Sequence, residues 1–147
     1  MTLMAASAFA ITGVDVSEPL SESDWECLMS PGGQGAVQWA SVRGYQSNGR
    51  PDSNAASSIK AAKAAGIKHV SAYIFPCVSC GDGGGQVNDA VYNLNANNAS
   101  PDMYWYDVER YNWSSNLTSN RNFITDMITE GKKLGIKAGI YTNYYNW

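Results

Sequence analysis

The sequence predicts an α/β fold in which parallel strands and helices alternate, as in part of a barrel built from βα units. Five short segments rich in β-branched and aromatic residues are separated by loops or amphipathic helices. The segments 65–68 (Ala-Gly-Ile-Lys) and 134–137 (Leu-Gly-Ile-Lys) repeat each other, and each joins a helix to a strand. Three of the strands end in acidic or polar residues, which is how a parallel barrel forms its active face.

The five strands are each expected where such residues form a short run. Their expected ranges are 11–17, 36–43, 69–75, 103–109 and 137–142. The segment between the first two strands contains Trp25 and Cys27 and is expected to be mostly loop. A barrel of eight strands typically needs about 250 residues, so five strands are expected to form only an incomplete portion of one.

Three helices are expected between the later strands. The first begins at Ser53 or Asn54, either of which can cap it, and continues to residue 65, where Gly66 ends it. The second covers 86–97 and the third 119–134, and each has an apolar face at helical spacing. The glycine-rich segment 81–85 is expected to be a flexible loop, because it matches no phosphate-binding motif.

The overall composition indicates one globular domain. The chain has 147 residues, of which 44% are hydrophobic and 16% charged, and this excludes a disordered tail or a coiled coil. A net charge of −3 gives no electrostatic basis for binding nucleic acid. No apolar run approaches the roughly 20 residues of a membrane span. We therefore expect neither nucleic acid nor membrane as a partner.

Residues 1–10 form a short apolar run that ends in Ala8-Phe9-Ala10. This pattern fits the remnant of a signal peptide, or simply an apolar start, because no positively charged region precedes it. Three acceptor sequences for N-glycosylation begin at Asn98, Asn112 and Asn116. Together these features predict a secreted protein, or one of the lysosome or phagosome.

The cysteines are Cys27, Cys77 and Cys80. The spacing Cys77-Val-Ser-Cys80 is found in zinc and redox sites, but zinc would need a second pair or a nearby histidine. In a secreted protein disulfides are the better interpretation, and the sequence leaves their pairing open. We expect no metal and no other cofactor.

The segment Met103-Tyr-Trp-Tyr-Asp-Val-Glu109 carries the strongest functional signal. Side chains two apart on a strand lie on the same face, about 6.6 Å apart along the backbone, so Trp105, Asp107 and Glu109 should lie together. Two carboxyls so placed repel each other, which suits a glycosidase that keeps one protonated beside one ionised. The plainer alternative is an exposed strand end. Asp15 and Asn143, at the ends of two other strands, favour the functional interpretation.

Several motifs together resemble glycoside hydrolase family 25, the Chalaropsis-type lysozymes, and in particular their invertebrate and amoebal branch. The resemblance extends from Ile11 to the end of the chain, and its order and spacing match. It rests on Gly13-Val-Asp-Val-Ser17, Val42-Arg-Gly44, Ala65-Gly-Ile67 with Ser71-Ala-Tyr-Ile74, Tyr106-Asp-Val-Glu109, and Gly139-Ile-Tyr-Thr-Asn143.

The resemblance implies an irregular TIM-like barrel and an N-acetylmuramidase that cleaves the β-1,4 bond between N-acetylmuramic acid and N-acetylglucosamine in peptidoglycan. By position, Glu109 is expected to be the general acid. Asp107 is expected to stabilise positive charge or orient the acetamido group, and Asp15 to complete the acidic cluster. The sugar groove is expected to be lined by Tyr73, Trp105, Tyr141 and Asn143.

The family pattern has a further acid on its last strand, and this sequence has no such strand. We therefore interpret residues 11–147 as a lysozyme-like catalytic domain whose C-terminal part is missing, and expect a monomer when the protein is full-length. A catalytically inactive sugar-binding or vestigial fragment remains the alternative. A chitinase-like site is disfavoured, because Met103 and Trp105 stand where its motif requires acids.

Overall fold

The fold is built on a six-stranded sheet, seen in a computed structural model that describes residues 11–30, 37–110 and 112–145. Five strands pair in parallel in the order β1-β2-β4-β5-β6. Their bounds are β1 Gly13–Val16, β2 Trp39–Gln46, β4 His69–Ile74, β5 Tyr104–Asp107 and β6 Ala138–Tyr141. The α/β class and the five predicted parallel strands are confirmed. The sixth strand, β3 (Arg50–Pro51), pairs antiparallel with the end of β2 and is too short to leave a sequence pattern.

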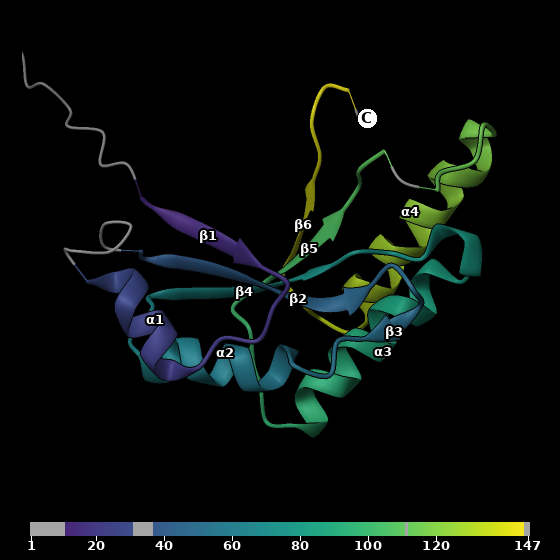
Figure 1. Cartoon of the computed structure of the whole chain (residues 1–147). Coiled ribbons are helices and arrows are strands. Elements are labelled where there is room, and N and C mark those ends of the chain that lie inside the picture. Colours follow the sequence, from purple (N-terminus) through teal and green to yellow (C-terminus); the bar gives the residue numbers. More distant parts are fainter. Residues whose placement is uncertain (1–10, 31–36, 111, 146–147) are drawn as a thin grey trace, which may run out of the picture.

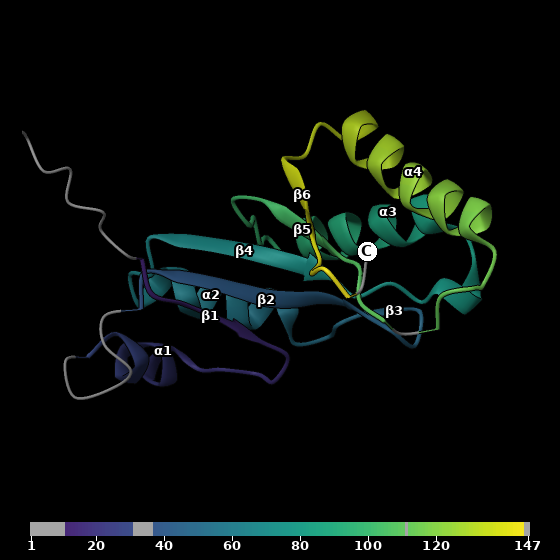
Figure 2. The ribbon, with the colours of Figure 1, turned by 90° about the horizontal axis from the view of Figure 1, so that it is seen from above.

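The four α-helices lie on one side of the sheet, and the opposite face, between β1 and β6, carries no helix in the described part of the chain (Figure 1). They are α1 Glu22–Met29, α2 Ala55–Ala64, α3 Gly83–Ala96 and α4 Leu117–Lys133, with a short 3₁₀ helix, η1, at Val78–Cys80. Figure 2 shows α3 and α4 side by side. None of the described helices is long and apolar enough to cross a membrane.

Helix α1 corrects the expectation of a loop between the first two strands. Ser21 and Asp24 form a capping box: the Asp24 amide donates to Ser21 Oγ at 3.3 Å, and the Ser21 amide donates to Asp24 Oδ2 at 2.8 Å. Trp25, a residue of this helix, is fully buried. The capping box and this anchor stabilise a helix whose apolar pattern is too short to show in the sequence.

The glycine-rich segment is also not the flexible loop that the sequence suggested, because Gly83, Gly84 and Gly85 form the first turn of α3. Asp82 caps this turn by accepting a hydrogen bond from the Gly85 amide at 2.8 Å. A Cβ atom on Gly83 would lie 2.6 Å from the Phe123 carbonyl oxygen of α4. Glycine is therefore required there by the close approach of two helices, not by a need for flexibility.

Alternation along the strands separates the core from the open face. Even-numbered residues of the strands pack against the helices, among them Ala40, Val42, Val70, Ala72, Ile74, Tyr104 and Tyr106. Odd-numbered residues of the same strands point to the face without helices, except Tyr45, which lies in the core because a bulge after Arg43 shifts the register. At the carboxyl ends of the strands, this second row contains the polar groups that the sequence singled out.

Candidate functional site

The open face of the sheet contains a cavity of about 470 Å³, within the usual size range for small-molecule sites. All five parallel strands, or the residues directly after them, contribute to its lining. The lining residues are Gly13, Val14, Asp15, Trp39, Ser41, Tyr73, Phe75, Trp105, Asp107, Glu109 and Tyr141. Side chains about 100 residues apart in the chain thus meet because parallel strands end at the same edge of the sheet.

Asp107 is the last residue of β5, and its side chain is nearly enclosed. Its Oδ1 atom is buried and has no hydrogen-bond partner among the described residues. Burial, together with the nearby charges of Glu109 and Asp15, raises the pKa of Asp107 to about 7. Glu109 lies two residues beyond the end of the strand and is half-buried.

Tyr73, on β4, places a phenol beside the acidic group. Burial raises the pKa of Tyr73 to about 12; Arg43 opposes this rise, while Asp15 and Asp107 add to it. The hydroxyl therefore stays protonated at any physiological pH and can donate a hydrogen bond to a ligand in the cavity.

An aromatic pair forms the floor of the cavity. The rings of Trp39 and Trp105, on β2 and β5, lie 5.8 Å apart at an angle of 37°. The Trp39 Nε1 atom donates to Ser71 Oγ at 3.0 Å, and Ser71 Oγ in turn donates to the Ala40 carbonyl at 3.1 Å. These bonds fix the indole of Trp39, so that the pair offers a rigid apolar surface to the flat face of a sugar ring.

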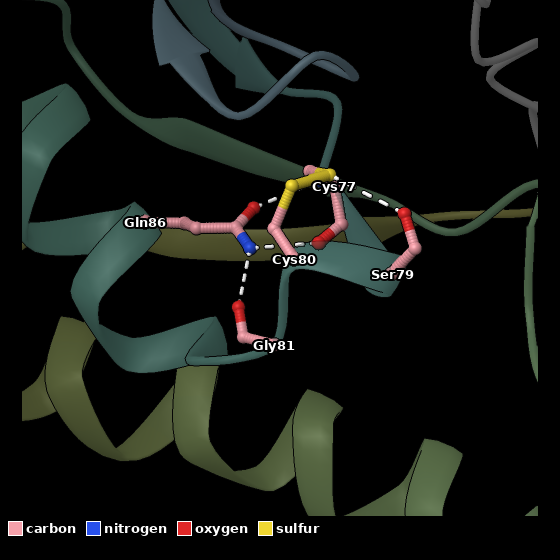
Figure 3. Close-up of a disulfide and its surroundings, with 5 residues drawn as sticks. All are labelled: Cys77, Ser79, Cys80, Gly81 and Gln86. Atoms are coloured by element: carbon pink, nitrogen blue, oxygen red, sulfur yellow. Dashed lines mark hydrogen bonds between the residues drawn. A yellow bond between two sulfur atoms is a disulfide. The ribbon is translucent and has the colours of Figure 1, made fainter.

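A disulfide joins Cys77 and Cys80 in the loop after β4, two residues beyond Phe75 (Figure 3). This settles the pairing that the sequence left open, and Cys27 is a free, exposed thiol. The buried side chain of Gln86 binds the same loop: its Oε1 accepts from the Cys77 amide, and its Nε2 donates to the carbonyls of Cys77 and Gly81, at 2.7–2.8 Å. The end of β4 is thereby fixed to α3.

The structure brings most of the predicted site residues into one cavity. Asp15, Tyr73, Trp105, Asp107, Glu109 and Tyr141 all line it. Asn143 is not among the lining residues, and its side chain accepts a hydrogen bond from the Tyr145 amide at 3.0 Å. The roles assigned to these residues remain predictions. Residues 1–10, expected to be a signal-peptide remnant, lie outside the described residues.

Trp39, Ser41 and Phe75 line the cavity but were not predicted as site residues. A signal was available for the first two: register pairs Trp39 with Gly13 and Ser41 with Asp15, so they share the inward row with the predicted acid. In residues 11–30, 37–110 and 112–145 no group of histidines, cysteines and acids is arranged to hold a metal ion.

Comparison with known proteins identifies the family. The family model described as "Lysozyme-like protein 1" matches residues 6–147. The chain is 36% identical over 140 residues to "Lysozyme-like protein 5" of Caenorhabditis elegans, covering 94% of this chain and 63% of that protein. It is 33% identical over 138 residues to "Probable GH family 25 lysozyme 4" of Dictyostelium discoideum, with the same coverage.

A third relative, "Probable GH family 25 lysozyme 5" of Dictyostelium discoideum, is 36% identical and is covered over 67% of its length. The chain thus spans about two thirds of the length of these relatives or slightly less. Among solved structures, the modular autolysin LytC from Streptococcus pneumoniae, in complex with a synthetic peptidoglycan ligand, has a similar fold. Its TM-score is 0.70 at 19% identity, over 87% of this chain and 31% of that one. The chain therefore belongs to the lysozyme-like family within glycoside hydrolase family 25.

Proposed function

We propose that this protein hydrolyses the glycan strands of bacterial peptidoglycan, at the β-1,4 bond between N-acetylmuramic acid and N-acetylglucosamine. One observation carries the proposal: two carboxyls from the end of β5 face the same sugar-sized cavity, and the pKa of one of them, Asp107, is raised to about 7. Family membership supports it, as does the peptidoglycan ligand bound by the autolysin of similar fold.

In this proposal Glu109 donates the proton to the leaving oxygen. Glu109 is less enclosed than Asp107, so its carboxyl is the one that an incoming glycosidic oxygen can reach. Asp107 holds a proton up to about pH 7, partly because Glu109 is nearby, and it can pass this proton to Glu109 when substrate arrives. Once ionised, Asp107 stabilises positive charge on the sugar ring or orients the acetamido group, and Asp15 adds negative potential.

The test is release of reducing ends from purified peptidoglycan, with identification of the sugar at the new end. We expect N-acetylmuramic acid there, and N-acetylglucosamine instead would contradict the proposed bond. Glu109→Gln keeps the shape of the side chain but cannot donate the proton, so activity should fall at least about 10²-fold. Asp89→Asn, which alters an exposed acid on α3, is the control and should leave activity unchanged.

A sugar-binding role without hydrolysis is the second candidate, because the Trp39–Trp105 pair could hold a glycan without any proton transfer. Sedimentation of the protein with insoluble peptidoglycan separates the two candidates. Binding without release of reducing ends would favour the second. If Trp39→Ala loses both binding and hydrolysis, the glycan binds at the Trp39–Trp105 pair, whichever of the two functions is correct.

We further propose that the protein works outside the cell or in the lysosome or phagosome. The Cys77–Cys80 disulfide supports this, because such bonds persist in oxidising compartments. Cell fractionation with an antibody against the chain tests it, and recovery mainly in the cytosol would contradict it.

A further inference from the structure

Arg43 places a cation on the row of side chains that forms the candidate site. It lies on β2 two residues beyond Ser41, and register pairs it with Tyr73 on β4. Its position on the inward row is therefore that of a site residue, although its side chain does not line the cavity.

The Arg43 guanidinium connects two segments that are distant in the chain. Its Nε atom donates to Asp52 Oδ2 at 2.8 Å, and its Nη2 atom donates to the Ser17 carbonyl at 3.0 Å. Asp52 lies just before α2, and Ser17 directly follows β1. One planar side chain thus joins the end of β1 to the start of α2.

Asp52 is a fixed anchor for this connection. Its side chain is 2% exposed, and it also accepts hydrogen bonds from Gln46 Nε2 and the Asn54 amide, both at 3.0 Å. Burial alone would raise the pKa of Asp52, but hydrogen bonds from Gln46, Asn54 and Arg43 outweigh it and hold that pKa below its usual value. The carboxylate therefore stays ionised at neutral pH and holds the guanidinium in one orientation.

The end of β1 depends on this contact. Among the described residues β1 is an edge strand that pairs with β2 alone, and its last paired residue is Val16. Asp15 precedes Ser17 by two residues. Pairing with β2 therefore holds the backbone of Asp15, and the bond from Arg43 to the Ser17 carbonyl holds the backbone just after the strand. We infer that Arg43, anchored by Asp52, is a positioning residue that fixes the Asp15 carboxyl at the cavity. This inference rests on the proposed hydrolysis for its effect on rate.

The experiment compares Arg43→Met with Lys63→Met. The control removes the exposed Lys63–Asp102 ion pair, 3.2 Å long, which does not touch the site. We expect Arg43→Met to lower kcat about 10-fold or more with KM within about 3-fold, since misplacing a charged group by about 1 Å can cost up to 10²-fold. Lys63→Met should change neither constant. Arg43→Lys keeps a donor for Asp52 but loses the planar group that also reaches the Ser17 carbonyl, so we expect it to recover only part of kcat.

A purely structural ion pair would lower the melting temperature but leave kcat per folded molecule unchanged, and that result would overturn the inference. A second readout does not depend on activity: the ¹³C NMR chemical shift of the Asp15 carboxyl. We expect this shift to change in Arg43→Met and to stay constant in Lys63→Met. If the unaltered protein released no reducing ends, the proposed function would fail, and the NMR comparison alone would decide: an unchanged Asp15 signal overturns the positioning role.

Discussion

Above about pH 7 the Asp107 carboxyl, which lines the cavity, carries a negative charge, and its buried Oδ1 atom has no hydrogen-bond partner among the described residues. An acid whose pKa is raised in the folded state binds its proton more tightly there than in the unfolded chain, where its pKa is near 3.8. Its contribution to stability is thus fully present below about pH 3.8 and is lost as the pH rises through about 7. Replacing this carboxyl should therefore stabilise the protein only where it would be charged.

We expect Asp107→Asn to raise the melting temperature at pH 8 by roughly 3 °C, which corresponds to about 1 kcal/mol once partial solvent screening is allowed for. At pH 3.5 the variant and the unaltered protein should melt almost together. Calorimetry at the two pH values checks this. A variant that is less stable than the unaltered protein at pH 8 would show that the charge is well accommodated.

The same carboxyl predicts the pH dependence of hydrolysis. If the proton held by Asp107 is needed for cleavage, the rate falls once that proton leaves, near the raised pKa of about 7. We expect kcat/KM for soluble glycan fragments to halve near pH 7 and to fall about tenfold for each further unit. A rate that stays flat to pH 9 would rule out the Asp107 proton as the catalytic one.

Helices α3 and α4 lie in close contact at Gly83. A Cβ atom on Gly83 would lie 2.6 Å from the Phe123 carbonyl oxygen, whereas one on Gly84 would meet only ordinary contacts of 3.4 Å or more. Both residues belong to the first turn of α3, so they form a matched pair. We expect Gly83→Ala to destabilise the protein by about 1–3 kcal/mol and Gly84→Ala to be neutral or slightly stabilising. Urea unfolding of both variants tests this, and equal effects would contradict the close approach.

The sequence correctly predicted elements whose residue pattern is local. It did not predict features that depend on contacts with residues distant in the chain. Alternation along 103–109 correctly placed Trp105, Asp107 and Glu109 on one face. Three consecutive glycines suggested a break in structure, because nothing local reveals that α4 needs Gly83 at its surface. The sequence could not predict which of the two carboxyls is more enclosed, because this depends on where β5 ends and on what packs around Asp107.

At the scale of the whole molecule, β1 and β6 each pair on one side only in the described part of the chain. Such edges bind strands of other molecules. We therefore expect residues 11–147, expressed alone, to self-associate as concentration rises, as measured by light scattering after size-exclusion chromatography. Tyr144 and Tyr145 are 91% and 76% exposed, so a variant with serine at both positions is the control, and it should still associate. A monodisperse monomer would contradict the prediction.

The strand order has a consequence for biosynthesis. Apart from the hairpin strand β3, the order across the sheet is the order along the chain, and the register partners Gly13 and Trp39 or Trp39 and His69 are separated by only one βα unit. Each strand that leaves the ribosome can therefore dock on an edge that is already in place, starting from the N-terminus. Asp15 lies on the first of the five parallel strands to be made and Asp107 on the fourth. The Asp15 and Asp107 carboxyls therefore come together, and begin to repel each other, only after the strands between them have formed.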